Sequence, residues 1–157
     1  MNVSGYYPAD MLNGPGTRVT VFVSGCEHRC RGCYNAMTWN PKNGKPYDVA
    51  FEQRVIDELN NPEIPKAGLS LSGGDPLYPN NVETILALVK RVREECPDKT
   101  IWLWTGYRIE DLSDAQKQVV DLIDVVIDGK FEEDLKDPTL VWRGSSNQRV
   151  IEVKQIS

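Results

Sequence analysis

The sequence lacks a long apolar run, a basic stretch and a leader-like N-terminus. No segment approaches the roughly 20 consecutive apolar residues that a membrane helix requires. Residues 1–10 show no basic region followed by an apolar run, so we expect no secretory signal and a cytoplasmic location. Basic residues number 18 against 23 acidic ones, whereas proteins that bind nucleic acid normally present a basic face to the phosphates. We therefore expect neither a membrane nor a nucleic acid as partner.

The sequence also lacks internal repeats, low-complexity tracts and a Pro/Gly-rich linker. Its 157 residues fit one ordinary domain and leave little room for a second. At that size roughly 68–70% of the surface of the unfolded chain is buried on folding, which allows a self-sufficient core. We expect a single domain over residues 1–157.

Short apolar runs rich in β-branched and aromatic residues alternate with amphipathic helical patterns. Helices are predicted over residues 48–59, over 81–96 and after a capping box formed by Ser113 and Gln116. The alternation predicts an α/β fold with βαβ crossovers and a mostly parallel sheet of about five strands. Five strands are too few for a closed eight-stranded barrel, so an open or partial barrel remains. The predicted strands are residues 17–24, 69–72, 100–105, 125–128 and 149–153.

Two of these strands end in notable motifs. Residues 17–24 run into Gly25 and Cys26, and residues 69–72 run into the segment Gly73-Gly74-Asp75-Pro76. Ligands of parallel α/β sheets bind beyond the carboxyl ends of the strands. We therefore expect both motifs on the same rim of the sheet, where they form one site.

Three of the four cysteines, Cys26, Cys30 and Cys33, fall within eight residues. Without a secretory signal, such clustering indicates a metal or redox site rather than a disulfide framework. Thiolates are soft ligands that suit iron–sulfur clusters and zinc. The spacing fits a bacterial ferredoxin poorly because no fourth cysteine is near, and a structural zinc site with His28 as fourth ligand is an alternative. Three thiolates on four irons would leave one iron open for chemistry.

The segment Gly73-Gly74-Asp75-Pro76 has two interpretations. On its own it is typical of a turn between a strand and a loop. Two consecutive glycines also let a ligand approach the backbone closely, and a buried carboxylate beside them would bind an ammonium group.

The C-x3-C-x2-C spacing resembles the signature of the radical S-adenosylmethionine superfamily. Most of the chain resembles one family within it, the anaerobic ribonucleoside-triphosphate reductase-activating proteins. The matching stretches occur in family order over nearly the full length. They are residues 13–18, 22–26, 32–35, 69–77, 102–107, 128–131 and 142–148.

The resemblance implies an enzyme, a glycyl-radical activase with a partial (β/α) barrel. It implies that the three cysteines hold a [4Fe-4S] cluster whose fourth iron is open to S-adenosylmethionine. One electron from a donor such as reduced flavodoxin would cleave S-adenosylmethionine to methionine and a 5′-deoxyadenosyl radical. That radical would abstract a hydrogen from a glycine of the large subunit of the anaerobic reductase, while the protein supplies placement and excludes water.

The resemblance also implies which residues contact S-adenosylmethionine. Many superfamily members carry an aromatic residue directly before the third cysteine, beside the adenine. Here Gly32 stands at that position and the aromatic residue is Tyr34, so adenine contacts are expected from the backbone around residues 32–34. The implied contacts are Gly32, Cys33, Tyr34, Gly73, Gly74 and Asp75.

Two other functions stay open. The first is a radical S-adenosylmethionine enzyme acting on a small molecule, although such enzymes usually need more chain to enclose their substrate. The second is a zinc or iron–sulfur module used for interaction or electron transfer. An active site left open on one side favours a macromolecular substrate that brings its own cover.

Four further side chains have simple interpretations. His28, the only histidine, is expected to be exposed in the cysteine loop. Cys96 is expected to be a small buried hydrophobe. Trp102 and Trp104 alternate with apolar neighbours along a strand, so we expect them to pack in the core.

Two polar segments are less specific. Residues 13–18 are best interpreted as a structural turn before the first predicted strand. Arg143 is either a partner or cofactor contact, through bidentate bonding of a carboxylate, or a solvated surface residue.

Overall fold

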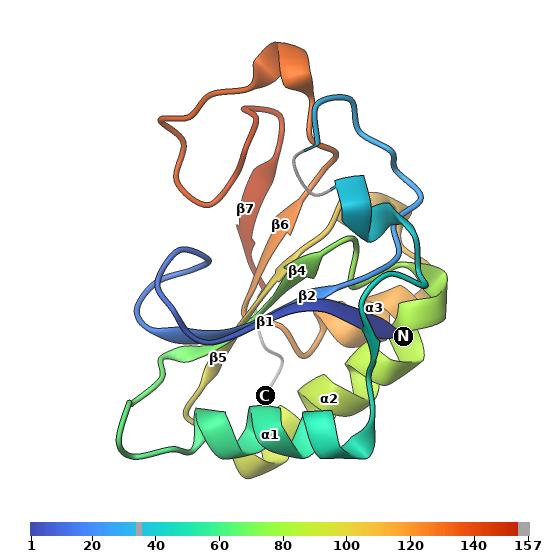
Figure 1. Ribbon diagram of the computed structural model, residues 1–157. Helices are drawn as coiled ribbons and strands as arrows, with labels where there is room; N and C mark the ends of the chain where they lie inside the picture. Colours follow the sequence, from blue (N-terminus) through green and yellow to red (C-terminus); the bar gives the residue numbers. More distant parts are fainter. Residues whose placement is uncertain (34–35, 154–157) are drawn as a thin grey trace.

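The computed structural model describes residues 1–33 and 36–153. Its strands are β1 Asn2–Asp10, β2 Arg18–Val23, β3 Lys45–Pro46, β4 Gly68–Gly73, β5 Thr100–Trp104, β6 Val125–Asp128 and β7 Arg149–Glu152. They form one sheet in the order β3-β1-β2-β4-β5-β6-β7 (Figure 1). The central strands β2, β4, β5 and β6 run parallel, whereas β1, β3 and β7 pair antiparallel at the sides.

The predicted α/β class is confirmed, whereas the prediction of a mostly parallel sheet holds only for its centre, and the predicted type of partial barrel stays a prediction. The sheet is open, with β3 and β7 at its edges. All five predicted strands are present, but the count of about five was too low, because β1 and β3 had not been expected. The pattern of β1 is broken by Gly5 and Pro8, and its pairing with β2 shifts register between Val3 and Gly5. It therefore shows no continuous apolar run in the sequence.

Three α-helices lie on one side of the sheet: α1 Val49–Leu59, α2 Val82–Glu95 and α3 Asp114–Val120 (Figure 1). The Asp48 side chain caps α1 by accepting a hydrogen bond from the Phe51 backbone N–H at 2.8 Å. The predicted capping box of α3 is confirmed, with Ser113 and Gln116 bonded reciprocally. These caps satisfy N–H groups that the first helical turn leaves without partners.

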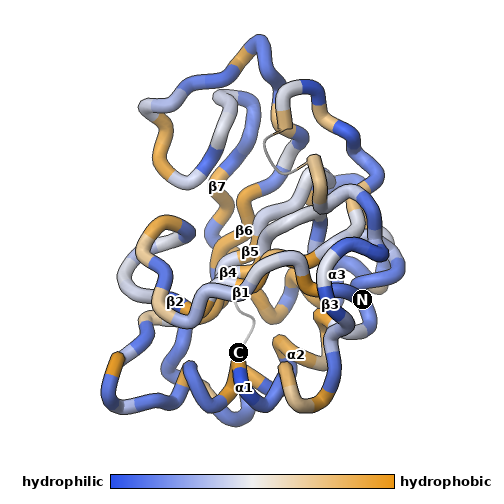
Figure 2. Tube along the Cα trace, viewed as in Figure 1, coloured by the Kyte–Doolittle hydropathy of each residue, from blue (hydrophilic) through white to orange (hydrophobic). Residues whose placement is uncertain are grey.

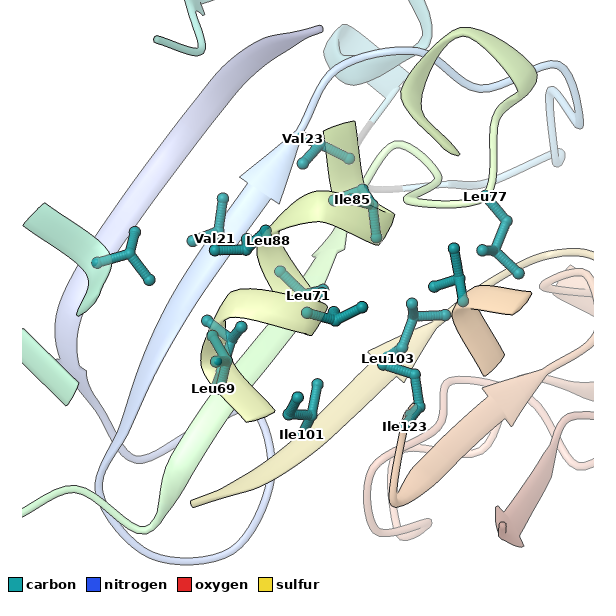
Figure 3. Close-up of a cluster of buried hydrophobic side chains, with 14 of the residues drawn as sticks. Val21, Val23, Leu69, Leu71, Leu77, Ile85, Leu88, Ile101, Leu103 and Ile123 are labelled. Carbon is teal, nitrogen blue, oxygen red and sulfur yellow. The ribbon is translucent and has the colours of Figure 1, made fainter. Parts of the chain in front are cut away.

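The main core lies between the helices and the face of the sheet that they cover. Alternate residues of each central strand point into it, as the period of two in a strand requires. Figure 3 shows Ile85 and Leu88 of α2 packed over this face. The strand residues that contribute are Val19, Val21, Val23, Leu69, Leu71, Ile101, Leu103 and Val126.

The other face of the sheet carries a smaller apolar cluster and a buried arginine. Trp102 packs with Val125 and Ile127, and Trp104 packs against this cluster, which confirms the prediction that both tryptophans serve packing. Arg18 at the start of β2 is fully buried, and its guanidinium lies 5.8 Å from the centre of the Trp102 ring.

The guanidinium of Arg18 explains why residues 13–18 form a structural turn. It donates to Pro15 O at 3.2 Å, to Ser70 Oγ at 2.8 Å, and to Leu69 O and both oxygens of Thr100 at 3.0 Å. Buried charges are costly unless their hydrogen-bonding groups are satisfied. The turn is thereby fixed to β4 and β5 at the end of the sheet opposite the two motifs.

The loops above the carboxyl ends of the parallel strands are largely hydrophilic, whereas the centre of the sheet is hydrophobic (Figure 2). Among the described residues no helix has the length and apolar character needed to cross a membrane.

Candidate iron–sulfur site

The cysteine loop, residues 26–33, follows β2 at the upper rim of the sheet (Figure 1). Its three cysteines are partly buried. The chain turns tightly between them, with positive φ angles at Arg29 (50°) and Gly32 (76°). A backbone hydrogen bond of 3.2 Å from Cys33 N to Cys30 O closes the second turn.

The sulfur atoms of Cys26 and Cys30 accept hydrogen bonds from backbone N–H groups, and both residues are partly buried. Burial raises the pKa of the Cys26 thiol to about 11, while backbone N–H groups of His28 and Arg29 that bond its sulfur act in the opposite direction. Burial also raises the pKa of Cys30, whose sulfur accepts from the Phe131 N–H. A cluster would have to displace these thiol protons, and N–H···S bonds and burial are the features that tune iron–sulfur potentials. The donor set and its surroundings therefore fit a cluster.

The second motif packs directly against the residues that lead into the cysteine loop, as its position on the rim predicted. Gly74 N donates to Val23 O at 2.9 Å, and Asp75 N donates to Gly25 O at 2.7 Å. A Cβ atom on Gly74 would stand 2.6 Å from Gly25 O and 2.9 Å from Thr38 O. The glycine is therefore required for close approach of two backbone segments.

The Asp75 carboxylate is buried and accepts hydrogen bonds from four residues. Leu77 N donates to Oδ1 at 2.9 Å and Gly106 N to Oδ2 at 2.9 Å. The Thr105 hydroxyl donates at 2.8 Å, and His28 Nε2 lies 2.7 Å from Oδ2. The two oxygens of a carboxylate offer about four lone-pair sites, so protein groups already use its capacity.

His28 was expected to be exposed, and this prediction is wrong. Its side chain is only 5% exposed because the ring contacts Asp75 and packs edge-to-face on Tyr107, with ring centres 4.4 Å apart. The Tyr107 hydroxyl in turn hydrogen-bonds the Glu27 carboxylate. The cysteine loop is thus fastened at residues 27 and 28 to the loop after β5.

A single metal ion is an alternative occupant of this region. Ligand atoms of Cys26, His28 and Asp75 lie within 4.8 Å of one another. However, both oxygens of Asp75 already accept from the protein, and His28 is one of their partners. The arrangement favours a positioning role for His28 and Asp75 over ligation of a lone ion.

A cavity of about 770 Å³ opens beside the cysteine loop. Such a volume is within the usual range for a ligand site. The residues around it come from the cysteine loop, from the segment after β5, from the end of β6 with the segment after it, and from the start of β7 with the segment before it. They are Glu27, His28, Gly106, Tyr107, Arg108, Asp111, Asp128, Gly129, Lys130, Glu132, Asn147 and Arg149.

The remaining residues named from the sequence have different surroundings. Cys96 is 1% exposed, which confirms it as a buried hydrophobe. A Cβ atom on Gly32 would meet the Glu133 side chain at 2.9 Å, so this glycine packs against the segment after β6. Arg143 donates to Gln148 O at 2.6 Å and orders its own loop; its contact with a partner or cofactor stays a prediction. Tyr34 lies outside the described residues.

Thr105 and Gly106 were missed as parts of the site. They directly follow β5, so the rule that sites form beyond the carboxyl ends of parallel strands would have found them. Nothing in the sequence pattern shows that His28 pairs with a carboxylate 47 residues away.

Comparison with known proteins relates this site to a family. A family model described as "4Fe-4S single cluster domain" matches residues 12–151. The anaerobic ribonucleoside-triphosphate reductase-activating protein of Escherichia coli (strain K12) is 60% identical over 150 residues, which cover 96% of this chain and 97% of the relative. Proteins with the same name from Haemophilus influenzae and Enterobacteria phage T4 are 54% and 48% identical, over 94% and 96% of this chain and 96% and 93% of their own lengths.

Proposed function

Because the chain belongs to the family of anaerobic ribonucleoside-triphosphate reductase-activating proteins, we propose that it activates that reductase by generating a glycyl radical on its large subunit. The observation that carries the proposal is the contact of Asp75 with His28 of the cysteine loop and with Gly25 just before that loop, in a chain that matches a 4Fe-4S single cluster domain. Residues 1–157 act as one domain in this proposal.

Cys26, Cys30 and Cys33 are the proposed ligands of a [4Fe-4S] cluster. Soft thiolates suit such a cluster, and a set of three leaves one iron for S-adenosylmethionine. When bound, the cluster and S-adenosylmethionine would together supply reductive cleavage of the sulfonium, with an electron from a donor such as reduced flavodoxin. The chain itself places the thiols, donates N–H groups to two of them and shields them from water.

The proposed contacts to S-adenosylmethionine are the backbone around Gly32, Cys33 and Tyr34 and the segment Gly73–Asp75. Direct bonding of the amino group by Asp75 stays a prediction. Its four protein donors favour a second role, in which Asp75 orients the Gly73-Gly74 backbone and His28.

A protein substrate is favoured over a small molecule because the sheet is open. The sheet ends at β3 and β7 and does not close around the cavity. A segment of the reductase laid over the rim would supply both a cover and the hydrogen atom. Glycine is suited as the donor because it lacks a side chain that would block close approach.

The test is anaerobic incubation of the cluster-loaded protein with the reductase, S-adenosylmethionine and a strong reductant. We expect an electron paramagnetic resonance doublet from a glycyl radical, which narrows when the reductase carries α-deuterated glycine. The mixture without S-adenosylmethionine should remain silent. Formation of 5′-deoxyadenosine without any radical on the reductase would contradict the proposal and favour a small-molecule substrate.

A further inference from the structure

The charges of the chain are divided unevenly around the cysteine loop. Residues 26–47 hold four of the 18 basic residues and only one of the 23 acidic ones, which leaves 14 basic against 22 acidic residues in the rest of the chain. The single acidic residue, Glu27, hydrogen-bonds Tyr107 and lines the cavity. An acidic protein thus carries a basic segment where its proposed cluster ligands lie. The four cations are Arg29, Arg31, Lys42 and Lys45.

One of these cations is neutralised and the other three are not. Arg31 forms ion pairs of 2.9 Å with Glu133 and Asp134, in the segment after β6. The other three are exposed, and none of them forms an ion pair with a residue in the described parts of the chain. We call these three the basic edge: Arg29, Lys42 and Lys45. An acidic partner would be attracted to the basic edge and repelled by residues 132–134.

Arg29 brings the basic edge close to the proposed ligands. It is the neighbour of Cys30 in the chain, and its backbone N–H bonds the Cys26 sulfur. Its guanidinium lies 5.7 Å from the centre of the Trp39 ring, and Trp39 O accepts from Cys26 N at 3.2 Å. An aromatic ring attracts a guanidinium without cancelling its charge. A protein that contacts Arg29 is therefore next to two of the three cysteines.

The two lysines belong to the segment that runs from the rim along the side of the sheet toward α1 (Figure 1). Asn43, the neighbour of Lys42, accepts a hydrogen bond of 2.7 Å through its carbonyl from Ser24 Oγ, two residues before Cys26. Lys45 lies in β3, two strands away from the end of β2. At the usual strand spacing this separation is roughly 10 Å. All three cations therefore lie around the point where β2 enters the cysteine loop.

The basic edge is separate from the cavity, because no member of it is among the described residues that line the cavity. In the proposed function a segment of the reductase covers the cavity. A partner on the basic edge would approach the cysteines from outside and leave the cavity accessible. This position suits an electron donor, which has to approach the cluster but not the reacting glycine. Complexes between redox proteins have small interfaces, and complementary charge steers their association.

We propose that the basic edge is the docking surface for an acidic one-electron carrier protein. This inference rests on the proposed function and names the place where its electron enters. One electron leaves the carrier and enters the cluster, so the carrier is oxidised and the cluster is reduced by one electron each. No bond forms or breaks between the two proteins. The carrier and the reductase then occupy different surfaces of this chain.

The experiment compares the cluster-loaded parent with two triple variants. The first neutralises the basic edge by Arg29→Gln, Lys42→Gln and Lys45→Gln. The second is a matched control, Arg54→Gln, Lys90→Gln and Lys117→Gln, which removes one exposed cation from each of α1, α2 and α3 and changes the net charge equally.

The probe is an acidic flavodoxin, and two quantities are measured. The first is the dissociation constant of oxidised flavodoxin, determined by calorimetry at low salt and at high salt. The second is the rate of cluster reduction, followed by absorbance, with reduced flavodoxin below saturation or with reduced methyl viologen. Methyl viologen is a small reductant that needs no docking surface.

For the basic-edge variant we expect a dissociation constant raised about tenfold at low salt, the combined effect of three exposed charge pairs. The difference should shrink to about twofold or less at high salt, because salt screens exposed charges. Reduction by flavodoxin should slow in parallel, whereas reduction by methyl viologen should stay within about twofold of the parent. The control variant should stay within about twofold in every measurement.

Unchanged flavodoxin binding in the basic-edge variant, or an equal loss in the control variant, overturns the inference alone. Slower reduction by methyl viologen would mean that the cations support the cluster itself, and it also overturns the inference. A raised half-saturating concentration of the reductase with normal flavodoxin binding would assign the basic edge to the reductase instead. If the parent reduced by methyl viologen forms no 5′-deoxyadenosine from S-adenosylmethionine, the proposed function fails, whatever the binding of flavodoxin.

Discussion

His28 Nε2 and Asp75 Oδ2 lie 2.7 Å apart and join the two motif loops side chain to side chain. The backbone of Asp75 adds a second link, because its N–H donates at 2.7 Å to the carbonyl of Gly25, the residue just before the cysteine loop. Asp75 is thus the residue at which the cysteine loop, the Gly73–Asp75 segment and the loop after β5 meet. Its carboxylate would hold these three loops in place whether or not a cofactor is bound.

Replacing Asp75 tests this structural role. In the parent protein, hydrogen-bond donors face both oxygens of the Asp75 carboxylate. Asp75→Asn replaces one of these oxygens by an amide N–H₂ group, which cannot accept, so at least one buried donor loses its partner. We expect the free energy of unfolding of the iron-free protein to fall by about 1–3 kcal/mol, measured by urea denaturation. Asp134→Asn is the control, because that carboxylate is 87% exposed and its bond to Arg31 is on the surface. Equal stability of Asp75→Asn and the parent would leave Asp75 with a cofactor role only.

The iron content of alanine variants should distinguish the three cysteines of the loop from Cys96. Alanine at Cys26, Cys30 or Cys33 removes one of the proposed ligands, so we expect loss of the [4Fe-4S] absorption and of 5′-deoxyadenosine formation after anaerobic reconstitution. Cys96→Ala should retain both, with a modest loss of stability, because Cys96 is buried among apolar side chains. Full activity in Cys30→Ala, or loss of iron in Cys96→Ala, would show that the ligands are assigned incorrectly.

Gly74 should tolerate no side chain, and the reason is packing against the protein. A Cβ atom there would stand 2.6 Å from Gly25 O, so Gly74→Ala must push apart the segment that leads into Cys26. We expect reduced stability of the iron-free protein and reduced iron uptake, measured by denaturation and by iron analysis. Gly144→Ala is the matched control, since its Cβ atom would come no closer than 3.4 Å to other groups. If Gly74→Ala binds as much iron as the parent and loses only S-adenosylmethionine binding, the packing explanation is wrong. Gly74 would then be a contact for S-adenosylmethionine alone.

Much of the fold was predictable because local signals and packing agree. The helices of residues 48–59 and 81–96 show apolar residues at helical spacing, and the capping box at Ser113 fixes the start of α3. The strand β1 was missed because it is an antiparallel strand whose second half is exposed. Its sequence therefore lacks the run of apolar residues that marks a strand buried on both faces.

The parts of the site that depend on strand topology were predictable from the sequence. The parts that depend on contacts between side chains far apart in the sequence were not. Parallel strands bring Gly25 and Gly74 to one rim, and this followed from strand order alone. The burial of His28 depends on space left by Gly106 and on the distant Asp75, which no local pattern reports. The polarity of Arg143 similarly did not show that its hydrogen bonds go to its own loop.

Gly106 and His28 should be energetically coupled. A Cβ atom on Gly106 would stand 2.7 Å from His28 Nε2, at the atom that bonds Asp75. Gly106→Ala must therefore displace the imidazole, and overpacking of this kind costs about 1–3 kcal/mol. With His28→Ala already present the space is free, so the same change should then cost less than about 0.5 kcal/mol, because an alanine has no ring to displace.

The double-mutant cycle is measured by urea denaturation of the parent, both single variants and the double variant. Iron content after reconstitution provides a second reading, because His28 lies within the cysteine loop. We expect Gly106→Ala to lower iron uptake when it is made in the parent and to have little further effect when it is added to His28→Ala. An equal stability cost of Gly106→Ala in both backgrounds would show that the alanine disturbs the backbone conformation at this position or the hydrogen bond from its N–H to Asp75. The cost would then not come from displacement of the His28 ring.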